Sequence, residues 1–156
     1  DVISVDAAIS ACEKAAQWRL ALGLLARMRP QLLEPDTVSY SAVIGTCEKA
    51  SAEWHLGLGL LAQMPRAGLQ PDTISYSAAI SACERGQEWQ AALALLGAAR
   101  QGNAEPNVVT YSAAISACEK GLQWQAALAL LREMDEDVLE PNVITCNAAI
   151  SACAGG

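Results

Sequence analysis

Apolar and polar residues recur along this chain with a period of about 35 residues. Each period begins with two β-branched residues and a hydroxyl residue, at Val2, Thr37, Thr73, Val108 and Val143. These starts lie 35, 36, 35 and 35 residues apart, and the extra residue falls in the turn before Trp54. A repeat of this length indicates an array of small helical units.

Each period predicts two helices. The first has apolar residues at helical spacing, as in Tyr76, Ala79, Ile80 and Cys83. The second opens on a tryptophan that we expect to pack in the core: Trp18, Trp54, Trp89 or Trp124. A proline followed by Asp or Asn closes the period, as in Pro106-Asn107. Proline disfavours helix in the preceding residue, and the Asp or Asn caps the next helix.

No single helix pair can bury its own apolar face, so stacked neighbours must form a continuous core. We therefore predict an all-α fold, a solenoid of stacked antiparallel helix-turn-helix repeats over residues 1–156. Repeat 1 spans 2–36, repeat 2 spans 37–72, repeat 3 spans 73–107, repeat 4 spans 108–142, and a partial repeat 5 spans 143–156. The chain begins with Asp1 and stops in mid-pattern, and we interpret it as a fragment without a targeting segment.

Three features resemble the pentatricopeptide repeat: Val108-Val-Thr-Tyr-Ser, the Ala-Leu-x-Leu-Leu of the second helix, and the closing Pro-Asn. The tetratricopeptide pattern fits less well, because it has its Trp in the first helix. Repeat 1 departs from the pattern, with Val5 and Asp6 where Tyr and Ser recur. The resemblance implies a right-handed superhelix that binds single-stranded RNA, one base per repeat, in organellar RNA processing, stability, editing or translation.

In the family that the chain resembles, the fifth and last residues of a repeat select the base, and the second residue inserts between bases. The implied base-recognition pairs are Asp6 with Asp36, Ser41 with Asp72, Ser77 with Asn107, and Ser112 with Asn142, while Asn147 has no partner in its partial repeat. The implied base-wedging residues are Ile3, Val38, Ile74, Val109 and Ile144. Core packing is the alternative for these apolar residues, and a plain surface role is the alternative for the serines.

The chemistry of the pairs is consistent with these roles. A carboxylate only accepts hydrogen bonds and guanine offers two donors, so Ser41 with Asp72 suits G. Asn107 and Asn142 both donate and accept, which suits the mixed edge of adenine. The predicted RNA core is therefore 5′-GAA-3′, bound from repeat 2 to repeat 4.

The net charge of −7 is unusual for an RNA-binding protein, because neutralising phosphates supplies much of the affinity. Four basic residues share one position near the end of the first helices, and the resemblance implies that they contact phosphates: Lys14, Lys49, Arg85 and Lys120. Stacked repeats align them in a basic stripe. We expect the glutamate before each of them to face solvent and most other acidic residues to lie elsewhere.

The six cysteines invite a metal or disulfide interpretation. No C-x-x-C spacing occurs and His55 is the only histidine, so the spacing of a zinc site is missing. Equivalent residues of stacked helices lie ~8–10 Å apart, beyond the ~7 Å Cα separation of a disulfide. We predict reduced, structural thiols, no cofactor, no metal and no catalytic residue.

Two other function classes compete with RNA binding. A scaffold that binds protein or peptide partners is favoured by the acidity, and a groove of exposed apolar residues would indicate it. An enzyme subunit whose catalytic domain lies outside this chain is the second. We expect no membrane segment, because apolar runs such as residues 126–131 are far shorter than the ~20 residues of a spanning helix. The resemblance implies a location in the mitochondrion or chloroplast.

Overall fold

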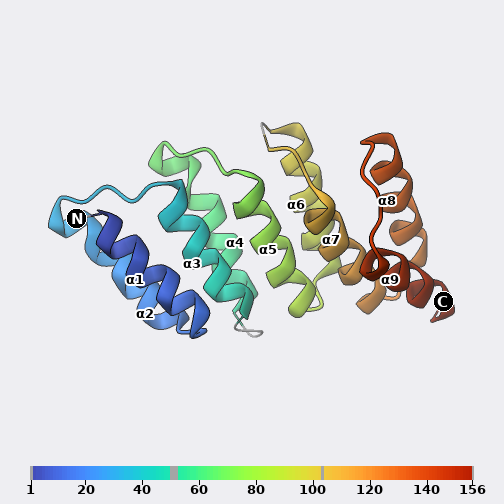
Figure 1. Cartoon of the computed structure of the whole chain (residues 1–156), viewed down its shortest axis with the longest axis horizontal. Coiled ribbons are helices and arrows are strands. Elements are labelled where there is room, and N and C mark those ends of the chain that lie inside the picture. The colour runs from blue at the N-terminus through green and yellow to red at the C-terminus, as the bar shows by residue number, and fades with distance from the viewer. Residues whose placement is uncertain (1, 50–52, 103, 156) are drawn as a thin grey trace.

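The helices follow one another in pairs in the computed structural model, which describes residues 2–49, 53–102 and 104–155 (Figure 1). The first helices of the pairs are α1 (Val2–Lys14), α3 (Thr37–Lys49), α5 (Thr73–Arg85), α7 (Val108–Lys120) and α9 (Val143–Ala154). The second helices are α2 (Trp18–Met28), α4 (Trp54–Gln63), α6 (Trp89–Gln101) and α8 (Trp124–Glu136). The described residues contain no β-strand, and the predicted all-α solenoid is confirmed. The extra residue predicted before Trp54 falls at 50–52, outside the described residues.

The helices form two layers. Each first helix packs against the next one, so α1, α3, α5, α7 and α9 make a continuous layer. Each second helix packs against its own first helix and against the first helix of the following repeat. Figure 1 shows the pairs succeeding one another along the long axis from α1 to α9. One face of the solenoid is therefore built from first helices alone.

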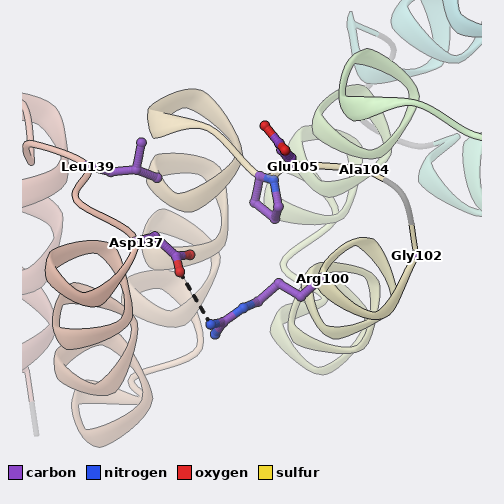
Figure 2. Close-up of a pocket in the computed structure, with 7 residues that line it drawn as sticks. Arg100, Gly102, Ala104, Glu105, Asp137 and Leu139 are labelled. Carbon is purple, nitrogen blue, oxygen red and sulfur yellow. Dashed lines mark ion pairs between the residues drawn. The ribbon is translucent and has the colours of Figure 1, made fainter.

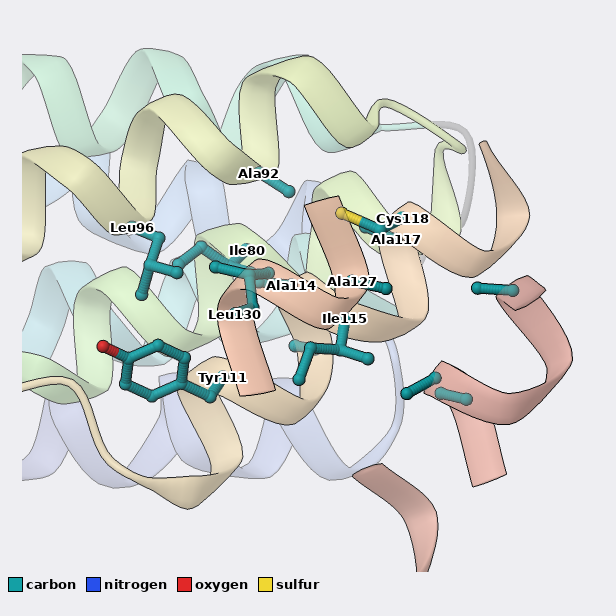
Figure 3. Close-up of a cluster of buried hydrophobic side chains, with 14 of the residues drawn as sticks. Ile80, Ala92, Leu96, Tyr111, Ala114, Ile115, Ala117, Cys118, Ala127 and Leu130 are labelled. Atoms are coloured by element: carbon teal, nitrogen blue, oxygen red, sulfur yellow. The ribbon is translucent and has the colours of Figure 1, made fainter. Parts of the chain in front are cut away.

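The core lies between the two layers. The eighth residue of each complete repeat is an isoleucine with no exposed surface: Ile9, Ile44, Ile80 and Ile115. Figure 3 shows Ile80 and Ile115 among Leu96 and Leu130 of the second helices. Ile150 holds the same position in α9 but is 67% exposed, because no described second helix follows α9. Full burial of one such side chain contributes about 1.5–3 kcal/mol, so stacking supplies most of the stability of each repeat.

Prolines shorten the second helices of repeats 1 and 2. Short 3₁₀ turns at Arg29–Gln31 and Pro65–Ala67 follow α2 and α4 and contain Pro30 and Pro65. A proline inside an α-helix removes one backbone hydrogen bond and clashes with the preceding turn. Repeats 3 and 4 have no proline there, and α6 and α8 each continue for 13 residues.

The tryptophans lie outside the centre of the core, and Trp54 and Trp89 pack at the seams between repeats. Trp18, Trp54 and Trp89 are half-buried, and Trp124 is 40% exposed. The expectation that all four pack in the core was therefore only partly correct. Trp18, Trp54 and Trp89 cover the edge of the core where their second helices begin.

All six cysteines are free thiols in the structure. Cys47, Cys83 and Cys118 are buried in successive first helices, whereas Cys146 and Cys153 are exposed on α9. Burial raises the pKa of Cys83 to about 12 and that of Cys118 to about 11. Within the described ranges, no helix is long and apolar enough to cross a membrane, and no three His, Cys, Asp or Glu side chains are grouped to hold a metal ion.

Candidate nucleic-acid interface

A groove of about 500 Å³ lies on the face formed by the first helices. Seven predicted site residues line it: Val38, Ile74, Val109, Ser41, Ser77, Asp72 and Asn107. The structure thus brings the predicted base-recognition and base-wedging residues of repeats 2 and 3 into one surface. The predicted phosphate contacts do not line this groove: Lys14, Lys49, Arg85 and Lys120. The predicted residues of repeat 1, together with Ser112, Asn142, Ile144 and Asn147, lie on the first helices or directly before them but outside the lining of this groove.

The second residue of each repeat is exposed in the first turn of its helix. The exposed fraction of these apolar side chains is 60–79%: Ile3, Val38, Ile74, Val109 and Ile144. Packing in the core therefore does not account for these side chains. They form a row of apolar groups spaced by one repeat along the first helices.

The last residue of each repeat caps the first helix of the next one, as the sequence predicts. Oδ1 of Asp72 accepts the backbone N–H of Ser75 at 2.8 Å, and Oδ1 of Asn107 accepts that of Thr110 at 3.0 Å. Asp36 and Asn142 make the same bond at 2.9 Å. Ordinary N-cap preference explains why Asp and Asn occupy this position. Because Oδ1 is engaged, the atom left for a ligand is Oδ2 of Asp or Nδ2 of Asn.

A hydroxyl group that the sequence analysis did not assign links the members of each predicted pair. The third residue of the following repeat is a fully buried Ser or Thr. Its hydroxyl lies within hydrogen-bond distance of the fifth residue of the preceding repeat: 2.8 Å between Ser41 and Ser75, and 2.6 Å between Ser77 and Thr110. Ser112 and Thr145 repeat the contact at 2.6 Å. The recurrence of a hydroxyl at this position was the signal in the sequence.

Repeat 1 has the same arrangement with a different charge. The hydroxyl of Ser39 lies 2.6 Å from Oδ1 of Asp6 and 3.1 Å from Oδ1 of Asp36. Two carboxylates therefore share one donor. A pair of this kind offers only acceptors to a ligand, which distinguishes repeat 1 from the serine-containing repeats.

Acidic residues lie beside the basic stripe, contrary to the expectation that they face solvent or lie elsewhere. Nζ of Lys49 is 3.3 Å from Oε1 of Glu13, and Nζ of Lys120 is 2.9 Å from Oε1 of Glu84. Each pair joins the ends of neighbouring first helices. The physical reason is the stacking of repeats, which brings the lysine of one helix next to the glutamate of the preceding one.

Glu48 occupies the equivalent position between these two ion pairs. Burial raises the pKa of Glu48, the neighbouring Arg85 and Lys49 lower it, and Glu13 and Glu84 raise it. Each basic residue of the stripe follows a glutamate in sequence, so the row as a whole carries no net charge. This row is therefore electrically balanced, whereas the residues that line the groove include the acidic Glu13, Glu48 and Asp72 and no basic residue.

A second hollow of about 670 Å³ is lined by the end of α6, the loop before α7 and the loop after α8 (Figure 2). Arg100 of α6 forms ion pairs there with Glu133 and Asp137, the latter at 3.5 Å. The hydroxyl of Tyr111 donates to Asp137 at 2.6 Å, and burial followed by this bond raises the pKa of Tyr111. The ion pairs join repeats 3 and 4, whereas the bond between Tyr111 and Asp137 lies within repeat 4. None of the predicted site residues lines this hollow.

Two family models match the chain. One, described as the PPR repeat family, matches residues 106–155, and the other, described as the Pentatricopeptide repeat domain, matches residues 1–50 and 59–120. No curated protein matches.

Several solved structures have the same fold. The pentatricopeptide repeat protein PPR10 in complex with an 18-nt psaJ RNA element is 29% identical, with a TM-score of 0.85, and the match covers 97% of this chain but 22% of PPR10. The PPR domain of the Arabidopsis thaliana protein-only RNase P 1 in complex with tRNA is 15% identical, with a TM-score of 0.86, and the match covers 98% of this chain and 80% of that one.

Nuclear proteinaceous RNase P 2 from A. thaliana is 13% identical, with a TM-score of 0.82, and the match covers 99% of this chain and 35% of that one. The two RNase P structures share the fold alone at this level of identity. The repeat period, the stacked helix pairs and the matches of both family models agree, and the chain belongs to the pentatricopeptide repeat family.

Proposed function

We propose that this chain binds single-stranded RNA along the layer of first helices, one nucleotide per repeat, without catalysing a reaction. The observation that carries the proposal is the exposed row of second residues beside the polar pairs. Val38, Ile74 and Val109 line the same groove as Ser41 and Asp72. Exposed apolar side chains that gather in one groove and are rimmed by polar groups are typical of a binding surface.

The spacing of the repeats fits unstacked bases. Packed helices lie ~8–10 Å apart, whereas stacked bases of one strand are separated by about 3.4 Å. A strand that places one base on each repeat must therefore be unstacked, as in the single-stranded segments that proteins recognise by sequence. Apolar side chains inserted between bases, such as Ile74 and Val109, would cover the faces that lose their stacking partners.

The free atoms of the last residues support the assignment of bases. Oδ2 of Asp72 is an acceptor, which suits the donors on the Watson–Crick edge of guanine. Nδ2 of Asn107 and of Asn142 is a donor, which suits N1 of adenine. We therefore assign repeats 2 to 4 the core sequence 5′-GAA-3′. PPR10 was solved in complex with an RNA element, and it is 29% identical to this chain.

Phosphate contacts in this proposal come from Lys14, Lys49, Arg85 and Lys120. Lys49 and Lys120 would have to exchange a glutamate for a phosphate, or contact both. The electrostatic part of the affinity is therefore smaller than four free cations would supply.

A direct test measures binding of a fluorescent 5′-UUUGAAUUU-3′ RNA by anisotropy. Val109→Ala removes an apolar side chain from the groove, and Val138→Ala removes one that is 89% exposed in the loop after α8. The loss of about 1 kcal/mol of apolar contact predicts a threefold to tenfold weaker complex for Val109→Ala. Val138→Ala should bind like the parent chain. Equal affinities for the two variants would contradict insertion between bases.

A scaffold that binds an extended peptide is the second candidate. Two observations favour it: the groove has no net basic charge, and exposed apolar side chains line it. A random RNA library distinguishes the two candidates. Enrichment of one sequence class supports RNA binding, whereas the absence of any RNA complex at low salt favours the peptide groove.

We also propose a mitochondrial or chloroplast location, which rests on membership of the family. The fold does not determine the compartment, because the similar RNase P 2 is described as nuclear. Imaging of the protein expressed from its own gene with a fluorescent tag is the test. A nuclear or diffuse signal would contradict this part of the proposal.

A further inference from the structure

The fifth and last residues of a repeat are connected only through the hydroxyl of the next repeat. Among the described residues, no direct hydrogen bond joins Ser77 to Asn107, yet both bond to Thr110. The same buried link joins Ser41 and Asp72 through Ser75. Both members of a predicted pair thus depend on one side chain that is itself inaccessible to a ligand.

The hydroxyl of Thr110 has a single proton, and its partners in repeat 3 determine the role of Ser77. Oγ1 of Thr110 accepts from the backbone N–H of Asn107 at 3.2 Å and donates its single proton to Oδ1 of Asn107 at 3.0 Å. The contact between Ser77 and Thr110 must then use the proton of Ser77. Among the described residues, Ser77 has no other hydrogen-bond partner. Ser77 therefore presents lone pairs, and not its proton, to the groove.

We propose that the hydroxyl of Thr110, the third residue of repeat 4, determines base specificity in repeat 3. It consumes the proton of Ser77, so that this serine acts as an acceptor, and it helps to orient Asn107 with Oδ1 inward. The matching serines Ser41 and Ser112 also donate to the backbone carbonyls of Thr37 and Val108, at 2.7 Å and 2.6 Å, so the neighbouring hydroxyl is not the sole acceptor for their protons. The inference rests on the proposed binding of RNA. The third residue is a positioning residue in this scheme, since it touches neither base nor phosphate.

The consequence is a different set of donors and acceptors for Asp and Asn. With Asn107, repeat 3 offers one acceptor and one donor, which matches N6–H and N1 of adenine. With Asp72, repeat 2 offers two acceptors, which match N1–H and N2–H of guanine. A serine hydroxyl that could rotate its proton towards the groove would lower the discrimination between bases, because it could donate to a base with an acceptor opposite the serine.

The Asp and Asn repeats also differ in the geometry of this link. Oγ of Ser75 lies 2.6 Å from Asp72 and 2.8 Å from Ser41. Oγ1 of Thr110 lies 3.0 Å from Asn107 and 2.6 Å from Ser77. The charged acceptor draws the hydroxyl closer, as charge-assisted hydrogen bonds do. The link is thus held most firmly where the last residue is Asp.

The test uses Thr110→Val, which removes the hydroxyl and keeps the branched shape. Four labelled RNAs, 5′-UUUGNAUUU-3′ with each base at N, give the ratio of best to worst Kd at the nucleotide of repeat 3. We expect this ratio to fall about tenfold in the variant, the effect of releasing one buried hydrogen bond. Binding of the other bases should improve, because Ser77 can now donate to them.

Two control variants separate specificity from folding. Thr110→Ser keeps the hydroxyl, as Ser75 does in repeat 3, and should retain the ratio. Thr46→Val removes another buried hydroxyl, one that bonds the carbonyl of Val43 at 2.6 Å, and should leave the ratio unchanged. A similar fall in Thr46→Val would mean that the effect comes from folding and would overturn the inference.

A double-mutant cycle with Ser77→Ala completes the test. If Thr110 acts through Ser77, the double variant loses no more discrimination than the more affected single variant. Additive losses, or an unchanged ratio in Thr110→Val, would overturn the role of the hydroxyl while leaving RNA binding intact. Failure of the parent chain to bind any of the four RNAs would instead reject the proposed function.

Discussion

The indole ring of Trp89 packs so closely against Gly121 that a β-carbon on Gly121 would lie 2.3 Å from Cδ1 of the ring. Trp54 and Gly86 repeat this relationship one unit earlier, at 2.4 Å. Both contacts join the start of a second helix to the end of the first helix of the next repeat. Glycine is required at these seams by space rather than by backbone conformation, because Gly86 and Gly121 have ordinary negative φ angles.

Gly121→Ala should therefore lower the stability of the array. The new methyl group must displace the ring near its attachment point, and overpacking of this kind costs about 1–3 kcal/mol. Gly97→Ala is the matched control, since nothing lies within 4 Å of the added carbon in the middle of α6. Alanine there should raise the stability by up to about 1 kcal/mol. Urea unfolding followed by circular dichroism measures both, and equal midpoints would contradict the packing argument.

Asp72→Asn should move the preference of repeat 2 from G towards A. The amide keeps the cap through Oδ1 but replaces the acceptor Oδ2 with a donor, so one bond to guanine is lost. An unpaired buried polar group costs about 1–3 kcal/mol, or roughly tenfold to a hundredfold in relative affinity. Competition between GAA and AAA RNAs measures the ratio. Stability should remain unchanged, whereas Asp72→Ala, which loses the cap, should lose about 1 kcal/mol.

Replacing Glu13, Glu48 and Glu84 together with Gln should strengthen RNA binding and steepen its salt dependence. The substitutions free Lys49, Arg85 and Lys120 from competing carboxylates. Four free cations would give a log–log slope of about −3, and we expect the parent chain to have a shallower slope. The triple variant should approach that limit. A slope that stays the same would show that the basic stripe does not contact phosphates.

RNA affinity should rise as the pH falls below neutrality. Burial raises the pKa of Glu48 above its ordinary value, so its proton is bound while most exposed carboxylates are still ionised. Protonation leaves Arg85 and Lys49 with less competing negative charge. For the same reason, Glu48 lowers stability at neutral pH, and this cost disappears as the pH falls through the raised pKa. Binding at constant ionic strength should depend less on pH in Glu48→Gln, and an unchanged profile would exclude this residue as the cause.

The cysteines should divide sharply in reactivity. Cys146 and Cys153 are exposed and should react with iodoacetamide in the native protein. Cys47, Cys83 and Cys118 are buried with raised pKa values, so almost no thiolate is present at about pH 8. Mass spectrometry should find them unmodified until urea is added. Early labelling of Cys83 would mean that the core opens far more readily than the packing suggests.

The sequence predicted the fold because the signals were local and repeated. The apolar spacing around Ile80 and the Asn107 cap each specify a helix without knowledge of its neighbours. The early end of α4 was missed, although Pro65 carried the signal. Its cause is also local, since a proline cannot continue an α-helix.

The contacts between repeats were not predictable in the same way. Glu48 and Lys49 are adjacent in sequence, but neighbouring side chains on a helix do not face each other, and the ion partner of Lys49 is Glu13 in the preceding repeat. The bond between Ser77 and Thr110 depends on the same stacking. Residue type and period identify positions, whereas pairing across repeats requires the distance and rotation between helices.

The layer of first helices is continuous, but a hollow of about 420 Å³ separates parts of α6 and α8 on the other side. The ion pair between Arg100 and Glu133 spans this hollow. Because only the first helices pack against one another, bending of the array should move the second helices apart or together. The spacing of the repeats along the groove should hardly change. Stretching and coiling would then alter the pitch of the superhelix at low energetic cost. An RNA strand bound along the first helices would therefore keep one nucleotide opposite each repeat during such movements.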